Sequence, residues 1–528
     1  MGSPSGSRRR NLIMILAGLI IFNVMSCTRP AGTLATFQSA RSDELSISGQ
    51  WNIIDVPPRS RVNAIHAALL PTGKVLIIAG SGNSPENFDA GSFTTLLWDP
   101  QTGQFSLIPT PDDMFCAGHT LLPDGKLLVA GGTQRYQKGT QPAHGASYSY
   151  EFDPQTQRYE RVADMHHGRW YPTLVGLADG NALAVSGLDE SGQPLDGHHE
   201  LFRRDISQWI ELPALNRYFP TYPALFLTAD GRLFYSASTA GYGHSDGAGR
   251  RPGLWNLADN SFTPVDGLRD PNLTETSTSV LLPPAQDQRV MVLGGGGIDD
   301  SAESTARTDI VDLRSPHPHF TPGADLAEPT RYLSAVILPD DTVLTTGGSR
   351  DYRGRGDSNN HIARIYDPAT NTFRAAAPPQ VGRNYHSEAL LLPDGRVVTL
   401  GSERLGDDDH STPGAFEQRI EVYSPPYLYR GSRPVLTVGP TVVPRGGTAE
   451  FATPDPDSIV TAKLMRPSAV THTTDVQQRS IALTVVRKDR AISVRVPAEA
   501  GLVPPGWYML FVTDRAGTPS VARWVQVP

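Results

Sequence analysis

The stretch HTLLPDGKLLVAGG, residues 119–132, decides the fold of this chain. Two apolar runs flank a Pro-Asp-Gly turn and the second run ends in Gly-Gly, which is typical of a tight β-hairpin. Six further copies of this pattern begin near residues 66, 172, 223, 278, 333 and 386. Because the 50 glycines and 45 prolines punctuate short apolar runs without helical periodicity, we expect an all-β chain.

The repeat predicts how these hairpins assemble. Their turns recur about every fifty residues, which is the period of a kelch-type propeller blade. Each hairpin is apolar on both faces and needs a neighbour on each side, so closing seven copies into a ring would bury all of them. We therefore predict a seven-bladed kelch-type β-propeller over residues 48–426.

The ends of the repeat make two further predictions. The segment GQWNIIDVP from Gly49 matches the outer strand GQFSLIPTP from Gly103 but precedes the first hairpin, whereas the seventh repeat lacks such a strand. We expect residues 48–57 to complete the seventh blade. Residues 427–528 contain short β-branched runs such as SIALTVV and AISVRV with Pro-Gly punctuation, which indicates an immunoglobulin-like β-sandwich.

The N-terminus predicts export. Three arginines precede an apolar stretch, residues 12–25, that is short for a membrane span, so residues 1–27 are interpreted as a signal peptide and 28–47 as a linker. Cys27 would carry a lipid anchor if this is a lipoprotein signal, or be removed with a plain secretory signal. The exported protein would be secreted, periplasmic or attached to the cell surface. A net charge of −8 with interspersed signs argues against nucleic acid as a partner.

Aligning the hairpins on their turns identifies the candidate site. Nine residues before each turn glycine, or before Asp341 where it replaces that glycine, we expect side chains at one height around the central channel. The fifth copy is too irregular to count. The other six positions are Ala64, Cys116, Tyr171, Tyr222, Tyr332 and His386.

This set of side chains suits a metal. Taken singly, a tyrosine or histidine here would be a packed structural residue, but imidazole and phenolate together are good donors for Cu(II). Tyr385 adds another phenol beside His386. Cys116 is the only cysteine left once the signal region is set aside, and a lone buried cysteine could also be a small apolar residue.

Four motifs carry a specific resemblance. DDMFCAGH around Cys116, GRWYPT around Tyr171, GRNYHSEALLLPDG around Tyr385 and His386, and SAVTHTTDVQQR around His472 resemble the motif set of the galactose oxidase and glyoxal oxidase family. The resemblance extends over the predicted propeller and the C-terminal domain. RWYP favours the glyoxal oxidase-like branch.

The resemblance implies a catalytic centre. One copper ion would be held by Tyr171, His386 and His472 as equatorial ligands and by Tyr385 as the axial ligand. A thioether between Cys116 and Tyr171 would form the radical cofactor, with Tyr385 as general base. The implied reaction oxidises a primary alcohol or hydrated aldehyde with dioxygen and yields hydrogen peroxide.

Substrate contacts are predicted less directly. Small aldehydes, simple alcohols or alcohol groups at glycan ends are favoured over galactose, with Tyr222, Tyr332 and Arg331 as pocket residues. The tryptophan that stacks on the modified tyrosine in galactose oxidase has no clear counterpart, since strand alternation would point Trp170 away from Tyr171. The alternative function is a non-catalytic kelch propeller that binds carbohydrate or protein, which gives no reason for the five metal-centre residues to occur together.

Overall fold

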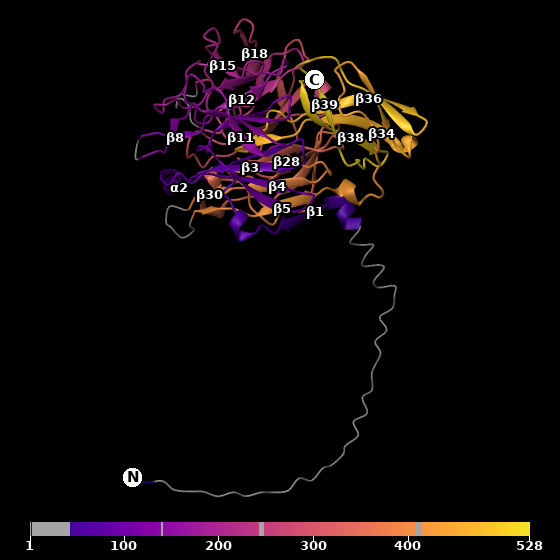
Figure 1. The fold of residues 1–528 in the computed structure, drawn as a ribbon, viewed down its shortest axis with the longest axis horizontal. Coiled ribbons are helices and arrows are strands. Elements are labelled where there is room, and N and C mark those ends of the chain that lie inside the picture. The colour runs from indigo at the N-terminus through magenta and orange to yellow at the C-terminus, as the bar shows by residue number, and fades with distance from the viewer. Residues whose placement is uncertain (1, 3–42, 139–140, 242–247, 407–413) are drawn as a thin grey trace. The chain divides into compact units, whose positions relative to one another are not determined.

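The computed structural model describes residues 2, 43–138, 141–241, 248–406 and 414–528 (Figure 1). By internal contacts the chain divides into residues 1–43 and a compact unit of residues 44–528. The predicted signal peptide with Cys27, and the linker up to residue 42, lie outside the described residues apart from residue 2. Within the described residues, no helix has the length and hydropathy to cross a membrane.

Each of the seven predicted hairpins forms the first two strands of its own antiparallel sheet. The first strands are β2 (His66–Leu69), β6 (Gly118–Leu121), β12 (Thr173–Gly176), β16 (Leu225–Leu227), β20 (Thr278–Leu281), β24 (Ser334–Ile337) and β28 (Ser387–Leu391). The second strands are β3 (Val75–Gly80), β7 (Leu127–Ala130), β13 (Ala182–Val185), β17 (Leu233–Tyr235), β21 (Arg289–Leu293), β25 (Val343–Thr346) and β29 (Val397–Gly401). Nearly all residues of these strands are buried, as expected for hairpins packed on both faces.

Two outer strands complete each sheet. The third strands are β4 (Thr94–Asp99), β10 (Ser149–Asp153), β14 (Glu200–Arg203), β18 (Gly253–Trp255), β22 (Thr308–Asp312), β26 (Ala363–Asp367) and β32 (Ile420–Ser424). The fourth strands are β5 (Gln104–Pro109), β11 (Arg158–Arg161), β15 (Gln208–Glu211), β19 (Phe262–Pro264), β23 (Phe320–Pro322), β27 (Thr372–Ala375) and β1 (Gln50–Ile54). The first strands of successive sheets contact one another, as β6 does β12, β24 does β28, and β28 does β2.

The seventh sheet takes its outer strand from the N-terminal side of the chain. β1 pairs antiparallel with β32, with Trp51 opposite Tyr423, and their rings lie 4.8 Å apart. The Trp51 indole donates a hydrogen bond to the Ala377 carbonyl in the neighbouring sheet, at 2.7 Å. Residues 50–54, within the predicted 48–57, therefore form the outer strand of the seventh sheet.

The C-terminal segment forms a six-stranded sheet in the order β33-β37-β36-β34-β38-β39. These strands are β33 (Thr448–Ala452), β34 (Ile459–Met465), β36 (Ser480–Lys488), β37 (Ala491–Arg495), β38 (Gly506–Asp514) and β39 (Arg523–Val527). One strand of this segment, β35 (Ala469–Thr471), instead pairs with β2 and adds a fifth strand to the first sheet. The C-terminal segment is thereby joined by main-chain hydrogen bonds to the innermost strand of that sheet.

Short elements occupy the connections. Two small hairpins are formed by β8 (Thr133–Arg135) with β9 (His144–Gly145), and by β30 (Glu403–Arg404) with β31 (Ala415–Phe416). The helical turns are α2 (Pro85–Asp89), η1 (Pro58–Ser60), η2 (Ala285–Asp287), η3 (Tyr352–Asp357), η4 (Pro426–Tyr429) and η5 (Pro456–Ser458). Of these, β30 and η3 supply residues to the site described next.

Candidate metal centre

Five of the six residues counted at the repeat position share one backbone conformation, and Ala64 is the exception. Cys116, Tyr171, Tyr222, Tyr332 and His386 all have positive φ, between 45° and 66°. Thr276 has φ 56° and takes the same place in the fifth sheet, where counting from the turn failed. Left-handed backbone is costly for side chains other than glycine and concentrates at functional sites.

Main-chain hydrogen bonds link these positions from sheet to sheet. The amide of Tyr171 donates to the Cys116 carbonyl, and that of Tyr222 to the Tyr171 carbonyl, both at 2.9 Å. The amide of Tyr332 donates to the Thr276 carbonyl in the same way, also at 2.9 Å. Equal repeat position therefore corresponds to equal height in the fold.

Four polar side chains converge beneath these bonds. Nε2 of His472 lies 3.0 Å from the Tyr171 hydroxyl, and the hydroxyls of Tyr171 and Tyr385 are in direct contact. The rings of His386 and His472 are 4.5 Å apart, edge to face. Among the described residues, Nε2 of His386 is buried without a hydrogen-bond partner. The group thus offers two imidazole nitrogens and two phenol oxygens to one point.

Burial keeps both imidazoles neutral. It lowers the pKa of His472 well below its ordinary value, and the nearby His386 and His66 lower it further. Burial also lowers the pKa of His386, although Glu403 works in the opposite direction. A neutral imidazole has the free lone pair that a metal ion requires, so the pair is prepared for metal binding.

A partly buried carboxylate orients His386. Nδ1 of His386 lies 2.7 Å from Glu403 Oε2, which leaves Nε2 directed at the convergence point. Glu403 also accepts from Asn83 at 2.7 and 2.9 Å and from Arg353 at 2.9 Å. Burial alone would raise the pKa of Glu403, but Arg353, His386 and Asn83 together hold it at about 2. A carboxylate behind a ligating histidine is the usual support of a metal centre.

Tyr385 contacts both His386 and Tyr171. Its ring stacks on His386 at 3.9 Å, and the Arg353 guanidinium lies 4.2 Å from the ring centroid. Burial raises the pKa of Tyr385 well above 10, with Cys116 and Glu403 adding to the shift. The phenol is therefore neutral by itself, and a bound cation would be needed to favour the phenolate.

Cys116 is completely buried in the same cluster. Its sulfur lies within 4.8 Å of a ring nitrogen of His386 and of His472. Burial raises the pKa of the thiol, and the nearby carboxylate of Asp113 raises it further. The thiol is therefore enclosed with Tyr171 and shielded from solvent.

The expectation for Trp170 was wrong. Its ring lies against Tyr171, with centroids 4.0 Å apart and planes inclined at 46°. Strand alternation fails here because Tyr171 has φ 66°, which turns the chain between the two side chains. A tryptophan therefore covers Tyr171 after all, and it is the residue directly before it in sequence.

His472 lies in a segment of the C-terminal part that contacts the first strands of two sheets. Gln477 contacts the first strand of the second sheet through Thr120 and the Leu121 amide. Gln478 bonds Ala335 and Ile337 on the first strand of the sixth sheet, at 2.8 and 3.0 Å. The buried Asp475 carboxylate accepts from the backbone N–H groups of Gln477 and Gln478. This segment is therefore fixed on two sides.

The residues predicted to contact substrate lie in different surroundings. Tyr222 is buried between Tyr171 and His472, at 4.5 and 4.7 Å between rings, and its hydroxyl donates to Ala117. Tyr332 is also buried and lies edge-on to Tyr385 at 5.8 Å. Their proposed part in substrate orientation stays a prediction.

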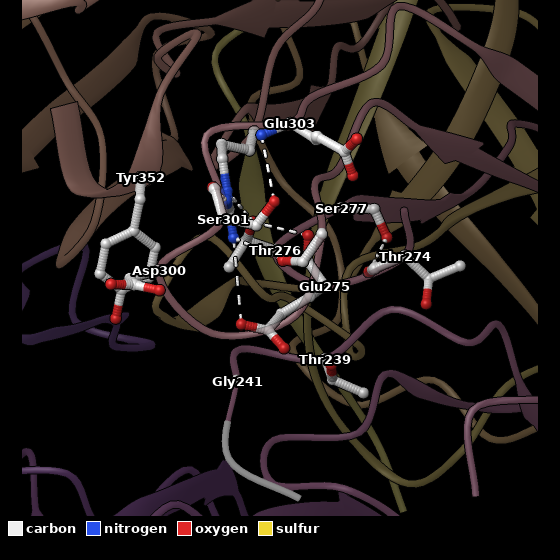
Figure 2. Close-up of polar contacts among 12 residues, drawn as sticks. Thr239, Gly241, Thr274, Glu275, Thr276, Ser277, Asp300, Ser301, Glu303 and Tyr352 are labelled. Atoms are coloured by element: carbon white, nitrogen blue, oxygen red, sulfur yellow. Dashed lines mark hydrogen bonds and ion pairs between the residues drawn. The ribbon is translucent and has the colours of Figure 1, made fainter. Parts of the chain in front are cut away.

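Arg331 precedes β24, and its fully buried side chain contacts the segment before β20 and the loop after β21. Its guanidinium donates to the Thr276 hydroxyl and to the carbonyls of Ser301 and Gly297. Figure 2 shows Thr276, Ser301 and Glu275 close to one another. A contact with substrate stays a prediction, whereas the hold of Arg331 on these loops is observed.

The sequence analysis did not predict several side chains that pack around the candidate metal centre. Phe115 packs edge-on to His386 at 5.5 Å and stacks on Tyr136, while Phe416 is parallel to His386 at 6.1 Å. Glu403 and Arg353 lie in loops that vary between repeats. The one available signal was the acidic residue of Gly-Ser-Glu after the seventh hairpin, at a place where the other countable repeats have serine, threonine or leucine.

Comparison with known proteins gives a consistent result. The family described as glyoxal oxidase N-terminus matches residues 92–427, and the galactose oxidase-like early set domain matches residues 433–527. A galactose oxidase of Gibberella zeae is 29% identical over 91% of this chain and 70% of its own length. The aldehyde oxidase GLOX1 of Arabidopsis thaliana is 26% identical over 92% and 86% of the two chains.

Among solved structures, a fungal alcohol oxidase of the AA5 family, in complex with copper, has a similar fold. It superposes with a TM-score of 0.76 at 24% identity, covering 91% of this chain and 99% of the other. A single solved structure therefore matches most of the seven-sheet part and most of the C-terminal part of this chain.

Proposed function

This chain belongs to the glyoxal oxidase and galactose oxidase family of copper radical oxidases, and from that premise we propose how its residues oxidise an alcohol or an aldehyde with dioxygen. In this proposal Tyr171, Tyr385, His386 and His472 hold one copper ion. The convergence of two phenol oxygens and two neutral imidazole nitrogens in a buried site carries the proposal. Nitrogen and oxygen donors of this kind suit Cu(II).

The proposed redox group is a thioether between Cys116 and Tyr171. Its formation would replace the thiol hydrogen and one ring hydrogen by a sulfur–carbon bond, with the two electrons and two protons passing to dioxygen. The burial of Cys116 beside Tyr171 supports this proposal, because the thiol has no competing partner from solvent. Trp170 would shield the modified ring from solvent on one face.

Each of these residues would then have its own role in the oxidation. Copper, when bound, would acidify the substrate hydroxyl and accept one electron. Tyr385 would accept the hydroxyl proton at its phenol oxygen, and Tyr171 would take a hydrogen atom from the substrate carbon. The two electrons and two protons removed from the substrate would leave with dioxygen as hydrogen peroxide. Glu403 would keep His386 in place throughout, since it binds the opposite ring nitrogen.

The fold supports a propeller carrying this centre. We interpret the seven four-stranded sheets, residues 48–426, as seven blades, and residues 427–528 as an immunoglobulin-like sandwich whose six strands divide between two faces sharing β36. We further propose that residues 1–27 direct export to the periplasm, cell surface or medium. Lipid attachment at Cys27 and removal of a plain signal peptide remain the two alternatives.

The proposed substrates are small aldehydes and simple primary alcohols, or alcohol groups at glycan ends. The test is a substrate panel assayed for hydrogen peroxide with copper-loaded protein, and Cys116→Ser as the matched control. We expect peroxide from wild type with at least one aldehyde or alcohol, and a large loss in the variant. Equal peroxide production by both proteins would contradict the proposed redox group.

Thioether formation gives a prediction that needs no substrate. Copper added in air to the metal-free protein should remove the free thiol, lower the mass by two hydrogen atoms and yield a peptide joining residues 116 and 171. Peptide mass spectrometry and thiol titration measure these changes. A thiol that persists after copper and oxygen would refute the cross-link.

A further inference from the structure

A second group of metal-ligand side chains lies at the surface of the third sheet. His167, His198 and Glu211 bring one ligand atom each to within 4.8 Å of the other two. Nε2 of His167 is 3.2 Å from Glu211 Oε1, and the two histidine rings are 4.7 Å apart. We propose that these three residues bind one divalent transition-metal ion, separate from the catalytic copper.

The three ligands come from separate segments of one sheet. Glu211 ends β15, His198 lies two residues before β14, and His167 is in the connection that leads into β12. β14 and β15 are paired, with Glu200 opposite Glu211. The strand pairing therefore places Glu211 beside the start of β14, two residues from His198.

A buried ion pair holds the histidine-bearing segments. The fully buried side chains of Arg169 and Glu200 meet at 2.9 Å, and the Arg169 guanidinium also donates to the His198 carbonyl at 2.6 Å. Glu200 accepts from the backbone amides of His166 and His167 at 2.6 and 3.3 Å. One ion pair thus fixes the backbone beneath both histidine ligands before any ion binds, which lowers the entropy cost of binding.

The donor set indicates the class of ion. Two imidazoles and one carboxylate suit Zn(II), Cu(II) and Ni(II) better than Mg(II) or Ca(II), which prefer oxygen ligands alone. The half-exposed to exposed side chains leave room for water to complete the coordination. In the affinity order of divalent ions Cu(II) exceeds Zn(II), so excess copper should load two ions per chain.

Zinc distinguishes this site from the catalytic centre. Isothermal titration of Zn(II) into protein loaded with a single equivalent of copper per chain, which leaves the surface site empty, should reveal one zinc site per chain, and zinc should raise the melting temperature because it binds the folded state. His198→Ala should weaken zinc binding at least about tenfold, equivalent to 1.4 kcal/mol. Peroxide production should be unchanged in this variant, since none of the three residues belongs to the catalytic centre.

His317→Ala is the matched control, because His317 is another exposed histidine, located between β22 and β23. It should bind zinc as wild type does. A second variant, Glu211→Gln, should also weaken zinc binding while keeping the strand pair intact. The proposal is refuted if wild type that carries one copper ion per chain takes up no zinc, or if His317→Ala and His198→Ala weaken zinc binding equally.

Discussion

At the scale of single residues, Tyr385 is proposed to be both a weak copper ligand and the group that accepts the substrate proton. Its hydroxyl contacts Tyr171 and its ring stacks on His386. Tyr385→Phe removes one phenol oxygen while retaining the ring, so copper should still bind and Cys116 should still couple to Tyr171. Turnover should fall by about 10²-fold or more, the usual effect of a missing general base.

Copper content, thiol titration and steady-state peroxide formation measure these three properties separately. The informative comparison is with wild type at equal copper occupancy. Near-normal peroxide production by Tyr385→Phe would mean that the substrate proton leaves by another route, and the role given to Tyr385 would be wrong.

Glu403 is predicted to act through His386 rather than on substrate. Glu403→Gln keeps the size of the side chain but removes the charge that His386, Arg353 and Asn83 share. Loss of such support behind a ligand typically costs 10–100-fold in metal affinity or activity. We expect a drop in this range in copper affinity, with an altered copper spectrum by electron paramagnetic resonance.

Glu417→Gln provides the comparison for Glu403→Gln. Glu417 is an acidic residue of the same region whose charge pairs with Arg419 at 2.5 Å. It should leave copper affinity and spectrum unchanged. If both variants lose copper equally, general destabilisation of this loop is responsible, and Glu403 is not a positioning residue.

The sequence predicted the positions of some of these residues and not of others. Counting back from the turns located Cys116, Tyr171 and His386, because the repeat fixes their height and backbone conformation. The same reasoning misplaced Trp170, since alternation assumes extended backbone and Tyr171 has φ 66°. It missed Glu403 because the loops after the hairpins follow no repeat.

At the scale of elements, β1 closes the seventh sheet with a strand far away in sequence. Trp51 supplies most of the buried contact of β1, being 5% exposed, packed on Tyr423 and bonded to Ala377. Trp51→Ala should therefore destabilise the protein by about 3–5 kcal/mol, the usual cost of truncating a buried tryptophan. Denaturant unfolding of the copper-free protein measures this change.

Ile53→Ala on the same strand is the control. Ile53 is 41% exposed, and its loss should change stability by no more than about 0.5 kcal/mol. If Trp51→Ala were equally mild, pairing of β1 would contribute little to closure. The predicted role of the N-terminal strand would then be wrong although the pairing exists.

Element patterns were predictable wherever a short turn joins the hairpin strands. In the fifth sheet the turn is replaced by a longer loop containing η2, so counting from a glycine found no equivalent residue. The structure identifies it as Thr276 from its φ of 56° and from the hydrogen bond it accepts from Tyr332. The φ angle and the main-chain hydrogen bond therefore identify the repeat position in the fifth sheet, although its longer loop prevents counting from a turn glycine.

At the scale of the whole molecule, the C-terminal segment completes the site formed by the seven sheets. β35 pairs with β2, and the segment carrying His472 bonds the second and sixth sheets through Gln477 and Gln478. The sequence predicted this arrangement only through the family resemblance, because no repeat relates His472 to the other ligands. Metal binding should therefore connect the two parts of residues 44–528.

His472→Ala tests that connection. The variant removes one of two imidazole ligands, so copper affinity should fall strongly, and the stabilisation that copper gives to the folded state should be lost with it. For wild type that stabilisation is about 2.7 kcal/mol when free copper is about 100 times the dissociation constant. Melting temperatures with and without copper, together with copper content, measure both effects.

Gln478→Ala separates the ligand from the docking of the segment that carries it. It removes the bonds to Ala335 and Ile337 but leaves His472, so the copper-free protein should melt at a lower temperature while copper still raises that temperature. His472→Ala should show the opposite pattern, with a smaller change in the copper-free protein and no rise with copper. If copper still stabilised His472→Ala as it does wild type, the nitrogen ligand would have to come from elsewhere, because His386 alone cannot account for the affinity of a two-imidazole site. The domain that follows the seven sheets would then serve stability alone.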